Sequence, residues 1–175
     1  MAIDLERVFK PIQIAVLTVS DTRGPEDDTS GDILAQRVVD AGHALVDRAI
    51  EKDDADVIAA RLNAWIDDPN VDAIVSTGGT GLTGRDVTPE AIDRVKERDI
   101  PGFGELFRWL SYKTIGTSTV QSRACAAVAR GTYIFALPGS NGAVKDGWDG
   151  ILAEQLDSRN RPCNFVELMP RLREK

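Results

Sequence analysis

The segment 76–90 holds the residues of this 175-residue chain that are best suited to chemistry. It reads Ser-Thr-Gly-Gly-Thr-Gly-Leu-Thr-Gly-Arg-Asp-Val-Thr-Pro-Glu and directly follows the apolar run 71–75. Four glycines lie within seven residues, so the backbone can turn tightly and bring its N–H groups close to an anion. The segment therefore predicts a loop that binds a phosphate-bearing ligand. The simpler alternative is a tight turn that only follows a strand.

The end of the same segment indicates which phosphate chemistry to expect. Thr88 is expected as the N-cap of a helix with Pro89 in its first turn, and Glu90 suits the helix dipole there. Asp86 then lies in the loop just before the helix. A carboxylate beside phosphate requires a cation, and Mg²⁺ prefers one or two carboxylates together with phosphate oxygens. Arg85 is placed either to bind phosphate or to balance Asp86.

Two familiar glycine motifs were compared with this loop. A Walker A loop needs a Gly-Lys pair, and the sequence contains none. Gly79, Gly81 and Gly84 match the spacing of a dinucleotide fingerprint, but the loop after the first expected strand lacks that pattern. A nicotinamide-dependent oxidoreductase is therefore the weaker interpretation.

Apolar runs and helical spacing alternate along the chain. Strands are expected at residues 12–19, 43–50, 71–75 and 132–137, of which 12–19 is a nearly continuous apolar run suited to burial on both faces and 43–50 alternates in part. Helices are expected at residues 31–41 (capped by Ser30), 55–66, 89–98, 103–112, 122–130 and 141–156. This order predicts an α/β protein with a three-layer α/β/α architecture and a mainly parallel sheet, formed by one domain over residues 1–175.

In such a sheet, ligands bind at the carboxyl ends of the strands, so the loops found there should converge. Ser20 and Asp21 follow the first strand, and residues 51–54 follow the second. Pro138, Gly139 and Ser140 follow the last strand. Acidic residues from three loops around the glycine loop predict a Mg²⁺-nucleotide site, although a residue such as Asp54 suits a helix cap equally well.

Composition excludes several classes of function. A net charge of −7 argues against nonspecific nucleic-acid binding, which needs a basic surface. The chain has neither an 18-residue apolar run nor a basic, apolar leader, so we expect a cytoplasmic protein without membrane contact. His43 is the only histidine, which argues against a zinc site or a histidine-based triad, and Cys125 is expected to fill core space.

Several motifs together resemble one family. They are Thr77-Gly78-Gly79-Thr80-Gly81, Arg85-Asp86, Thr88-Pro89-Glu90, Pro101-Gly102-Phe103-Gly104-Glu105, Ser122-Arg123 and Leu137-Pro138-Gly139-Ser140. The pattern resembles the MoaB/MogA family of molybdenum cofactor biosynthesis proteins over nearly the whole chain. Residues 26–31, 116–123 and 161–165 look closer to the MoaB branch. The resemblance implies a MogA-like fold, a homotrimer or homohexamer, molybdopterin binding, and partners among other molybdenum cofactor biosynthesis proteins.

The resemblance also implies a reaction, the adenylylation of molybdopterin by Mg-ATP with release of pyrophosphate. Asp86 and Asp53 match the functional aspartates of the family and are assigned to catalysis and to Mg²⁺. Arg123 is open to two interpretations, as a phosphate clamp or as a structural ion pair. The substrate-binding residues implied are Ser20, Asp21, Thr77, Gly78, Gly79, Thr80, Gly81, Arg85, Pro138, Gly139 and Ser140.

A second hypothesis is a noncatalytic molybdopterin-binding paralogue that serves as a scaffold or carrier. The MoaB branch, by the same resemblance, includes members that have lost adenylyl transfer, some of which lack the arginine and threonine around the loop aspartate. This chain has Arg85, Asp86, Thr88 and Asp53, which favours an active enzyme. The sequence leaves open trimer against hexamer, molybdenum against tungsten, and the role of the three tryptophans.

Overall fold

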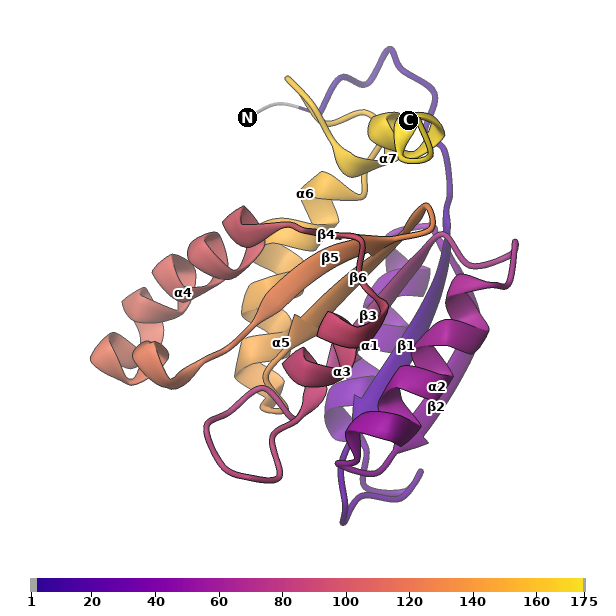
Figure 1. The fold of residues 1–175 in the computed structure, drawn as a ribbon. Helices are drawn as coiled ribbons and strands as arrows, with labels where there is room; N and C mark the ends of the chain where they lie inside the picture. Colours follow the sequence, from indigo (N-terminus) through magenta and orange to yellow (C-terminus); the bar gives the residue numbers. More distant parts are fainter. Residues whose placement is uncertain (1–2, 175) are drawn as a thin grey trace.

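The computed structural model, which describes residues 3–174, has one six-stranded sheet in the order β2-β1-β3-β6-β5-β4 (Figure 1). The strands are β1 Gln13–Val19, β2 Ala44–Glu51, β3 Ala73–Thr77, β4 Arg98–Asp99, β5 Cys125–Ala129 and β6 Thr132–Leu137. β2, β1, β3 and β6 are parallel, whereas β5 and β4 pair antiparallel. The expected mainly parallel sheet is confirmed, with an antiparallel edge added to it.

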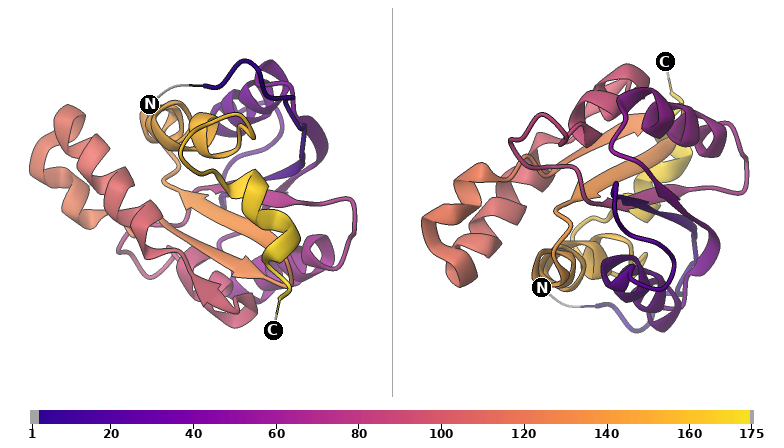
Figure 2. Two further views of the ribbon diagram at one scale, coloured as in Figure 1. Left: turned by 90° about the horizontal axis from the view of Figure 1, so that it is seen from above. Right: turned by 90° about the horizontal axis from the view of Figure 1, so that it is seen from below.

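Helices cover both faces of the sheet, as the two views of Figure 2 show. Alternate residues of β1 point to opposite faces: Ile14 and Val16 belong to one core cluster, and Ala15 and Leu17 belong to the other. The first cluster packs under α1, α4 and α5, and the second under α2 and α3. The helices are α1 Thr29–Asp40, α2 Ala55–Ile66, α3 Thr88–Val95, α4 Pro101–Ile115, α5 Asn141–Gly147, α6 Ala153–Gln155 and α7 Phe165–Leu168. The three-layer α/β/α architecture is therefore confirmed.

The helix expected at residues 122–130 was wrong, because this segment contains strand β5. A turn at Arg130 and Gly131, with φ angles of 49° and 92°, connects β5 antiparallel to β6. The small apolar residues of β5 are buried toward both faces of the sheet: Ala126 lies in one cluster and Ala127 in the other. Alanine favours helices by intrinsic propensity, but pairing and burial outweigh a preference of this size.

Helix boundaries also differ from the expectation at the start of α1, at both ends of α3 and at both ends of α4, which spans Pro101–Ile115 and not residues 103–112. The N-cap of α1 is Asp28, whose side chain accepts a hydrogen bond from the backbone N–H of Gly31, and not Ser30. The N-cap position of α3 is Val87, so Thr88 is already the first helical residue. That helix ends at Val95, since the chain then enters the short strand β4, and the last long helix contains a π-helical turn, Trp148–Leu152.

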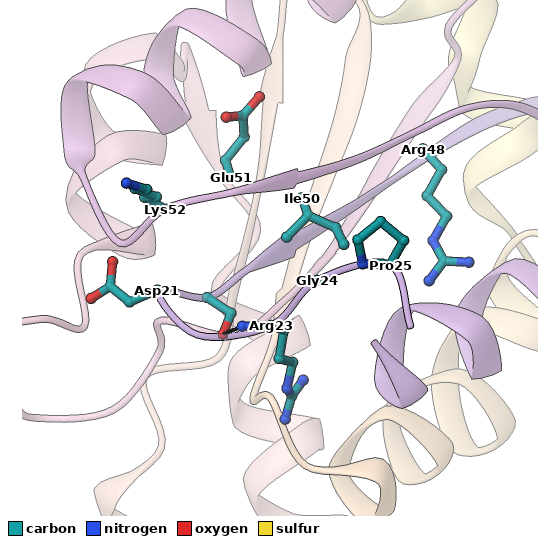
Figure 3. A pocket seen from close by; sticks show the side chains of 9 residues that line it. Asp21, Arg23, Gly24, Pro25, Arg48, Ile50, Glu51 and Lys52 are labelled. Atoms are coloured by element: carbon teal, nitrogen blue, oxygen red, sulfur yellow. Dashed lines mark hydrogen bonds between the residues drawn. The ribbon is translucent and has the colours of Figure 1, made fainter. Parts of the chain in front are cut away.

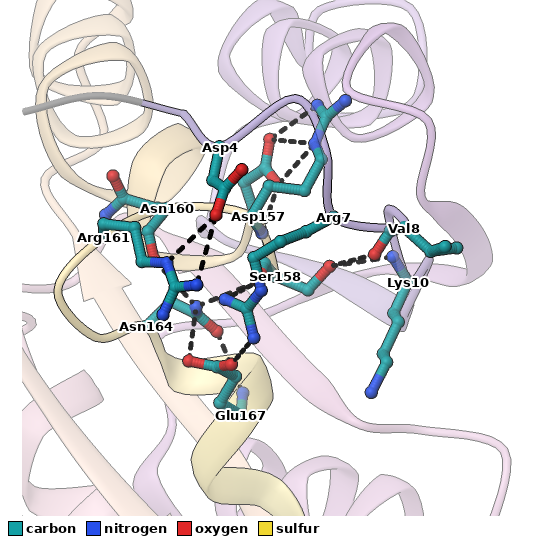
Figure 4. Close-up of polar contacts among 11 residues, drawn as sticks. Asp4, Arg7, Val8, Lys10, Asp157, Ser158, Asn160, Arg161, Asn164 and Glu167 are labelled. Atoms are coloured by element: carbon teal, nitrogen blue, oxygen red, sulfur yellow. Dashed lines mark hydrogen bonds and ion pairs between the residues drawn. The ribbon is translucent and has the colours of Figure 1, made fainter.

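Figure 4 shows how the N-terminal segment is held against the chain near the C-terminus. Arg7 donates to the backbone carbonyl of Ser158 and pairs with Glu167, and Asp4 pairs with Arg161. These contacts lie at the amino ends of the parallel strands, whereas the glycine loop lies at their carboxyl ends (Figure 1). In the part of the chain that the structure describes, no helix has the length and apolar character needed to cross a membrane.

Candidate functional site

The glycine loop leaves β3 through two residues in left-handed conformations, Gly78 with φ 101° and Gly79 with φ 65°. A Cβ atom on Gly78 would lie 2.1 Å from the carbonyl oxygen of Val19, and one on Gly79 would lie 2.4 Å from the hydroxyl of Thr88. Glycine is therefore required at both positions for conformation and for space. The Thr88 hydroxyl donates to the carbonyl of Gly78 at 2.9 Å, which pins the start of α3 to the loop.

Three acidic residues meet the loop from three strand ends. The backbone N–H of Asp21 donates to Asp53 at 2.9 Å, and the backbone N–H of Asp53 donates to Asp21 at 3.3 Å. Arg85 pairs with Asp21, its Nε lying 2.8 Å from the carboxylate. Asp86 accepts two hydrogen bonds from Thr83, one from the backbone N–H at 2.9 Å and one from the hydroxyl at 2.6 Å. These contacts fix the carboxylates relative to the loop.

A cavity of about 450 Å³, here called the central cavity, lies between these loops. Most of the residues named from the sequence line it: Ser20, Asp53, Gly78, Gly79, Thr80, Gly81, Arg85, Asp86, Pro138 and Gly139. The other three lie nearby. Asp21 lines a neighbouring cavity, Thr77 is buried beneath the loop with its hydroxyl on the Pro138 carbonyl, and Ser140 caps α5.

The carboxyl groups at this site have different proton affinities. Burial raises the pKa of Asp53, and the negative charge of Asp21 adds to this. The hydrogen bond from Arg85 lowers the pKa of Asp21. For Asp86, burial acts to raise the pKa, but the hydrogen bonds from Thr83 outweigh it and the pKa is lowered. Asp86 and Asp21 are therefore ionised at neutral pH, and Asp53 takes up a proton at higher pH than its neighbours.

The carboxylate oxygens of Asp53 and Asp86 suit a hard cation that binds together with a phosphate group. Asp53 accepts a hydrogen bond through Oδ2 and none through Oδ1 from the described residues, and both hydrogen bonds from Thr83 to Asp86 end on Oδ2. A Cβ atom on Gly79 would lie 3.2 Å from Oδ1 of Asp53, and one on Gly81 would lie 2.7 Å from Oδ2 and 3.0 Å from Oδ1 of Asp86, so both carboxylates lie against the loop. No group of three or more His, Cys, Asp or Glu residues within residues 3–174 forms a metal site. The donor set thus fits Mg²⁺ with phosphate oxygens as further ligands.

A second cavity, here called the α4 cavity, measures about 210 Å³ and adjoins the central cavity. Thr80, Gly81 and Pro138 line both. The hydroxyl oxygen of Thr80 is buried and has no hydrogen-bond partner among the described residues, which marks it as a group that a ligand can satisfy. The remaining lining includes Ser140, which the sequence had indicated, and residues that sequence reasoning missed: Phe107, Ser111, Ile115, Ser118, Thr119, Gln121, Ser122 and Ala143. The only sequence signal for it was the polar run 116–122 after α4.

A third cavity, here called the side cavity, measures about 570 Å³ and lies between the loop after β1 and the end of β2 (Figure 3). Ile50 and Pro25 face each other across its middle, with Arg48 at one end and Lys52 and Asp21 at the other. Arg23 lines both this cavity and the central one. Sequence reasoning missed Arg23, although it stands two residues after Asp21 in a loop already expected at the site.

Arg123 acts on the backbone of the glycine loop and on a neighbouring carboxylate. Its Nε donates to the carbonyl of Gly81 at 2.7 Å, its Nη2 donates to the carbonyl of Asp86 at 2.6 Å, and it pairs with Glu90. The structural interpretation of this arginine is therefore the one that fits. It lies just before β5, not in a helix.

The tryptophans fall into two groups. Trp65 and Trp148 are buried in the two core clusters, at 4% and 2% exposure. Trp109 on α4 is 58% exposed, so it does not belong to the core. None of the three lines the central or the α4 cavity.

The fold and the glycine-lined site define an α/β protein of the molybdopterin-binding class. Residues 15–158 match a family model described as "Probable molybdopterin binding domain". The chain belongs to this family, and within it to the MoaB/MogA proteins of molybdenum cofactor biosynthesis.

Relatives of known sequence and structure support this family membership. Molybdenum cofactor biosynthesis protein B of Escherichia coli K12 is 53% identical over 157 residues, which cover 90% of this chain and 92% of that protein. The Bacillus subtilis protein of the same name is 41% identical over 83% of this chain and 86% of its own. The tungsten cofactor synthesizing protein MoaB from Pyrococcus furiosus superposes with a TM-score of 0.79 at 33% identity, covering 94% of this chain and 99% of that one.

Proposed function

We propose that this protein adenylylates molybdopterin with Mg-ATP and releases pyrophosphate. The observation that carries the proposal is the pair of carboxylates, Asp53 and Asp86, which lie against the glycine loop and line one cavity with it. A noncatalytic binding protein has no need for two carboxylates beside a phosphate loop, because without a cation they would repel the ligand. Relatives named as molybdenum cofactor biosynthesis proteins place the chain in the same pathway.

In this proposal the α4 cavity takes the pterin, and the central cavity takes the pterin phosphate and the α-phosphate of ATP. The α4 cavity offers the aromatic and aliphatic surfaces of Phe107 and Ile115 together with several hydroxyl groups, which suits a flat ring bearing polar edges. Thr80 lies where the two cavities meet, and its free hydroxyl donates to the phosphate or the pterin. Backbone N–H groups of the glycine loop bind the α-phosphate.

The reaction is a nucleotidyl transfer. An oxygen of the pterin phosphate attacks the α-phosphorus of ATP, a new P–O–P bond forms, and the bond from the α-phosphorus to the β-phosphate oxygen breaks. The bonding electron pair leaves with pyrophosphate. The nucleophile is already an anion, so the site needs no general base, and positioning and charge neutralisation supply the catalysis.

The chain's own residues divide this task. Asp86 stays ionised because Thr83 lowers its pKa, and Asp86 and Asp53 orient the phosphates through the cation that accompanies them. Mg²⁺, when bound with ATP, neutralises charge on the phosphate oxygens. Arg85 neutralises further charge once it exchanges Asp21 for a phosphate.

The second candidate is a noncatalytic molybdopterin-binding paralogue, and one observation favours it. Arg85, a cation that lines the central cavity, pairs with Asp21. A site kept in that state would bind the pterin in the α4 cavity but not ATP in a reactive position.

The test is turnover by the purified protein with molybdopterin, ATP and Mg²⁺, followed as pyrophosphate and adenylylated pterin. Asp86→Asn should lower the rate about 100-fold or more, as loss of one preorganised charged group at a transferring centre does. Asp56→Asn, at a carboxylate 91% exposed on α2, is the matched control and should keep the full rate. Pterin binding with no product from the wild-type protein would establish the noncatalytic paralogue.

We further propose that α4 and the turn after it form the contact between subunits of a homotrimer or homohexamer. This helix projects from the body of the molecule (Figures 1 and 2). Four of its large apolar residues and one in the turn after it are exposed, and a surface of this kind marks an interaction site. They are Leu106, Trp109, Tyr112, Ile115 and, in the turn, Val120. Light scattering should give a smaller mass for Trp109→Glu than for the wild-type protein, and an unchanged mass would refute this interface.

A further inference from the structure

The side cavity carries an excess of positive charge. Five charged side chains line it. Three of them, Asp21, Arg48 and Glu51, form ion pairs with residues outside the cavity. Arg23 and Lys52 form no ion pair with any residue in the range 3–174 that the structure covers. In a chain with a net charge of −7, two cations without an ion-pair partner in one cavity point to an anionic ligand.

Arg23 is held in place without being neutralised. Its Nη1 donates to the hydroxyl of Ser30 at 2.7 Å, and its Nη2 donates to the carbonyl of Gly139 at 3.0 Å. Both acceptors are uncharged, and they use two of the five N–H donors of the guanidinium. The remaining donors are available at the border between the side cavity and the central cavity, because Arg23 lines both. Such a fixed, charged fork is suited to phosphate.

The three cavities follow one another in a fixed order. The side cavity shares Ser20 and Arg23 with the central cavity. The central cavity shares Thr80, Gly81 and Pro138 with the α4 cavity, whereas the side and α4 cavities share no residue. In phosphoryl transfer the attacking and leaving oxygens lie roughly in line on opposite sides of phosphorus. The side cavity adjoins the central cavity and is not occupied by a nucleophile that arrives from the α4 cavity, so it is the neighbouring space that can receive the leaving group.

We propose that the side cavity is the pyrophosphate subsite, in which Arg23 and Lys52 bind the β- and γ-phosphates of ATP. The inference rests on the proposed function, since it extends the reaction assigned to the central cavity. When the bond between the α-phosphorus and the β-phosphate oxygen breaks, the electron pair and the negative charge stay on that oxygen. Arg23 faces this charge at the border of the cavities, and Lys52 binds the far end of the departing group.

Calorimetric binding of three probes tests this: pyrophosphate with Mg²⁺, the nonhydrolysable ATP analogue with a methylene between its α- and β-phosphates, also with Mg²⁺, and AMP. Lys52→Gln should weaken binding of pyrophosphate and of the analogue about fivefold, which corresponds to the loss of one exposed ion pair. Arg23→Gln should weaken both about tenfold or more, and Arg23→Lys should recover part of the loss. AMP, which lacks these phosphates, should bind all variants equally.

Lys10→Gln is the matched control, because Lys10 is an exposed lysine just before the amino end of β1, away from the carboxyl ends of the strands where the cavities lie. It should leave all three affinities unchanged. Equal weakening of AMP and pyrophosphate would overturn the subsite and assign the cavity to the nucleoside, and unchanged pyrophosphate affinity in both the Arg23 and Lys52 variants would overturn it as well. These measurements involve no turnover, so a protein that binds pyrophosphate as proposed but forms no adenylylated pterin would refute the proposed function and leave the subsite standing.

Discussion

Removing the carboxylate of Asp28 should destabilise the protein far more than removing that of Asp32, although both pair with the same arginine. Asp28 has a side-chain exposure of 0%, and its Oδ2 accepts from Arg48 at 2.7 Å. The same oxygen accepts from the buried hydroxyl of Thr18 at 2.7 Å, and Oδ1 caps α1 at the N–H of Gly31. Asp32 also pairs with Arg48, but its side chain is 60% exposed.

The magnitude follows from what each substitution leaves behind. In Asp28→Ala the partly buried guanidinium of Arg48 loses one of its two carboxylates, the Thr18 hydroxyl loses its acceptor in the core, and α1 loses its cap. Breaking a buried pair costs about 3 to 5 kcal/mol, and these contacts overlap with the unpaired donor and the cap, so we expect a loss of about 4 kcal/mol in the free energy of unfolding. In Asp32→Ala only a surface pair is lost, worth below about 1 kcal/mol.

Urea unfolding at one fixed protein concentration, followed by circular dichroism, gives both free energies of unfolding. Fixing the concentration matters because subunit association would add to the apparent stability. Asp28→Asn, which keeps the shape and one acceptor oxygen, should fall between the two alanine variants. If Asp28→Ala and Asp32→Ala lose stability within about 1 kcal/mol of each other, the argument from burial is wrong.

Three further predictions concern single residues near the site or the sheet edge. Asp53→Asn should raise the melting temperature at pH 7 but not at pH values below an ordinary aspartate pKa. The raised pKa of Asp53 in the folded protein means that its ionised form opposes folding at neutral pH, and this penalty is absent once the group is protonated in both states. Gly79→Ala should abolish ATP binding in calorimetry, because its Cβ would collide with the Thr88 hydroxyl, whereas Gly84→Ala meets nothing within 4 Å and should bind normally. Iodoacetamide at pH 8 should modify exposed Cys163 quickly and Cys125 slowly, as read by mass spectrometry, because burial raises the pKa of Cys125 to about 11.

Each of these has an outcome that contradicts it. A melting temperature of Asp53→Asn that is equal to or below that of the wild-type protein at pH 7 would mean that the carboxylate stabilises the loop. ATP binding by Gly79→Ala would show that the glycine loop adapts to a side chain. Equal modification rates for the two cysteines would place Cys125 in contact with solvent.

Much of the fold could be predicted from the sequence because the inner parallel strands β1, β3 and β6 are mostly apolar runs, and amphipathic helices alternate with the strands. β1 and β6 were expected within one residue of their observed bounds. Segment 122–130 failed for a physical reason. Its run of alanines carries no period that separates a helix from a strand, and its pairing with β6 on one side and β4 on the other determines its conformation.

The candidate site was predicted as a set of loops but not as a set of contacts. The glycine loop and the acidic residues after β1 and β2 follow from the rule that strand ends converge. Arg23 and the residues after α4 were missed, because single polar residues in loops give no pattern in one sequence. Ser30 was expected to cap α1, yet Asp28 does so, since its carboxylate also satisfies the hydroxyl of Thr18 on a neighbouring strand.

The sequence by itself determined the alternating α/β order, the glycine loop that must pass close to an anion, and the resemblance that the family match confirmed. Only the tertiary structure decided which polar groups are free to act. Asp53 and Asp54 are adjacent and chemically identical, but Asp54 caps α2 while Asp53 directs an unpaired oxygen at the glycine loop. The same holds for the arginines: Arg123 binds loop carbonyls and Arg23 keeps free donors in a cavity. A sequence records which groups are present, whereas hydrogen bonding in the folded chain determines which of them are already satisfied.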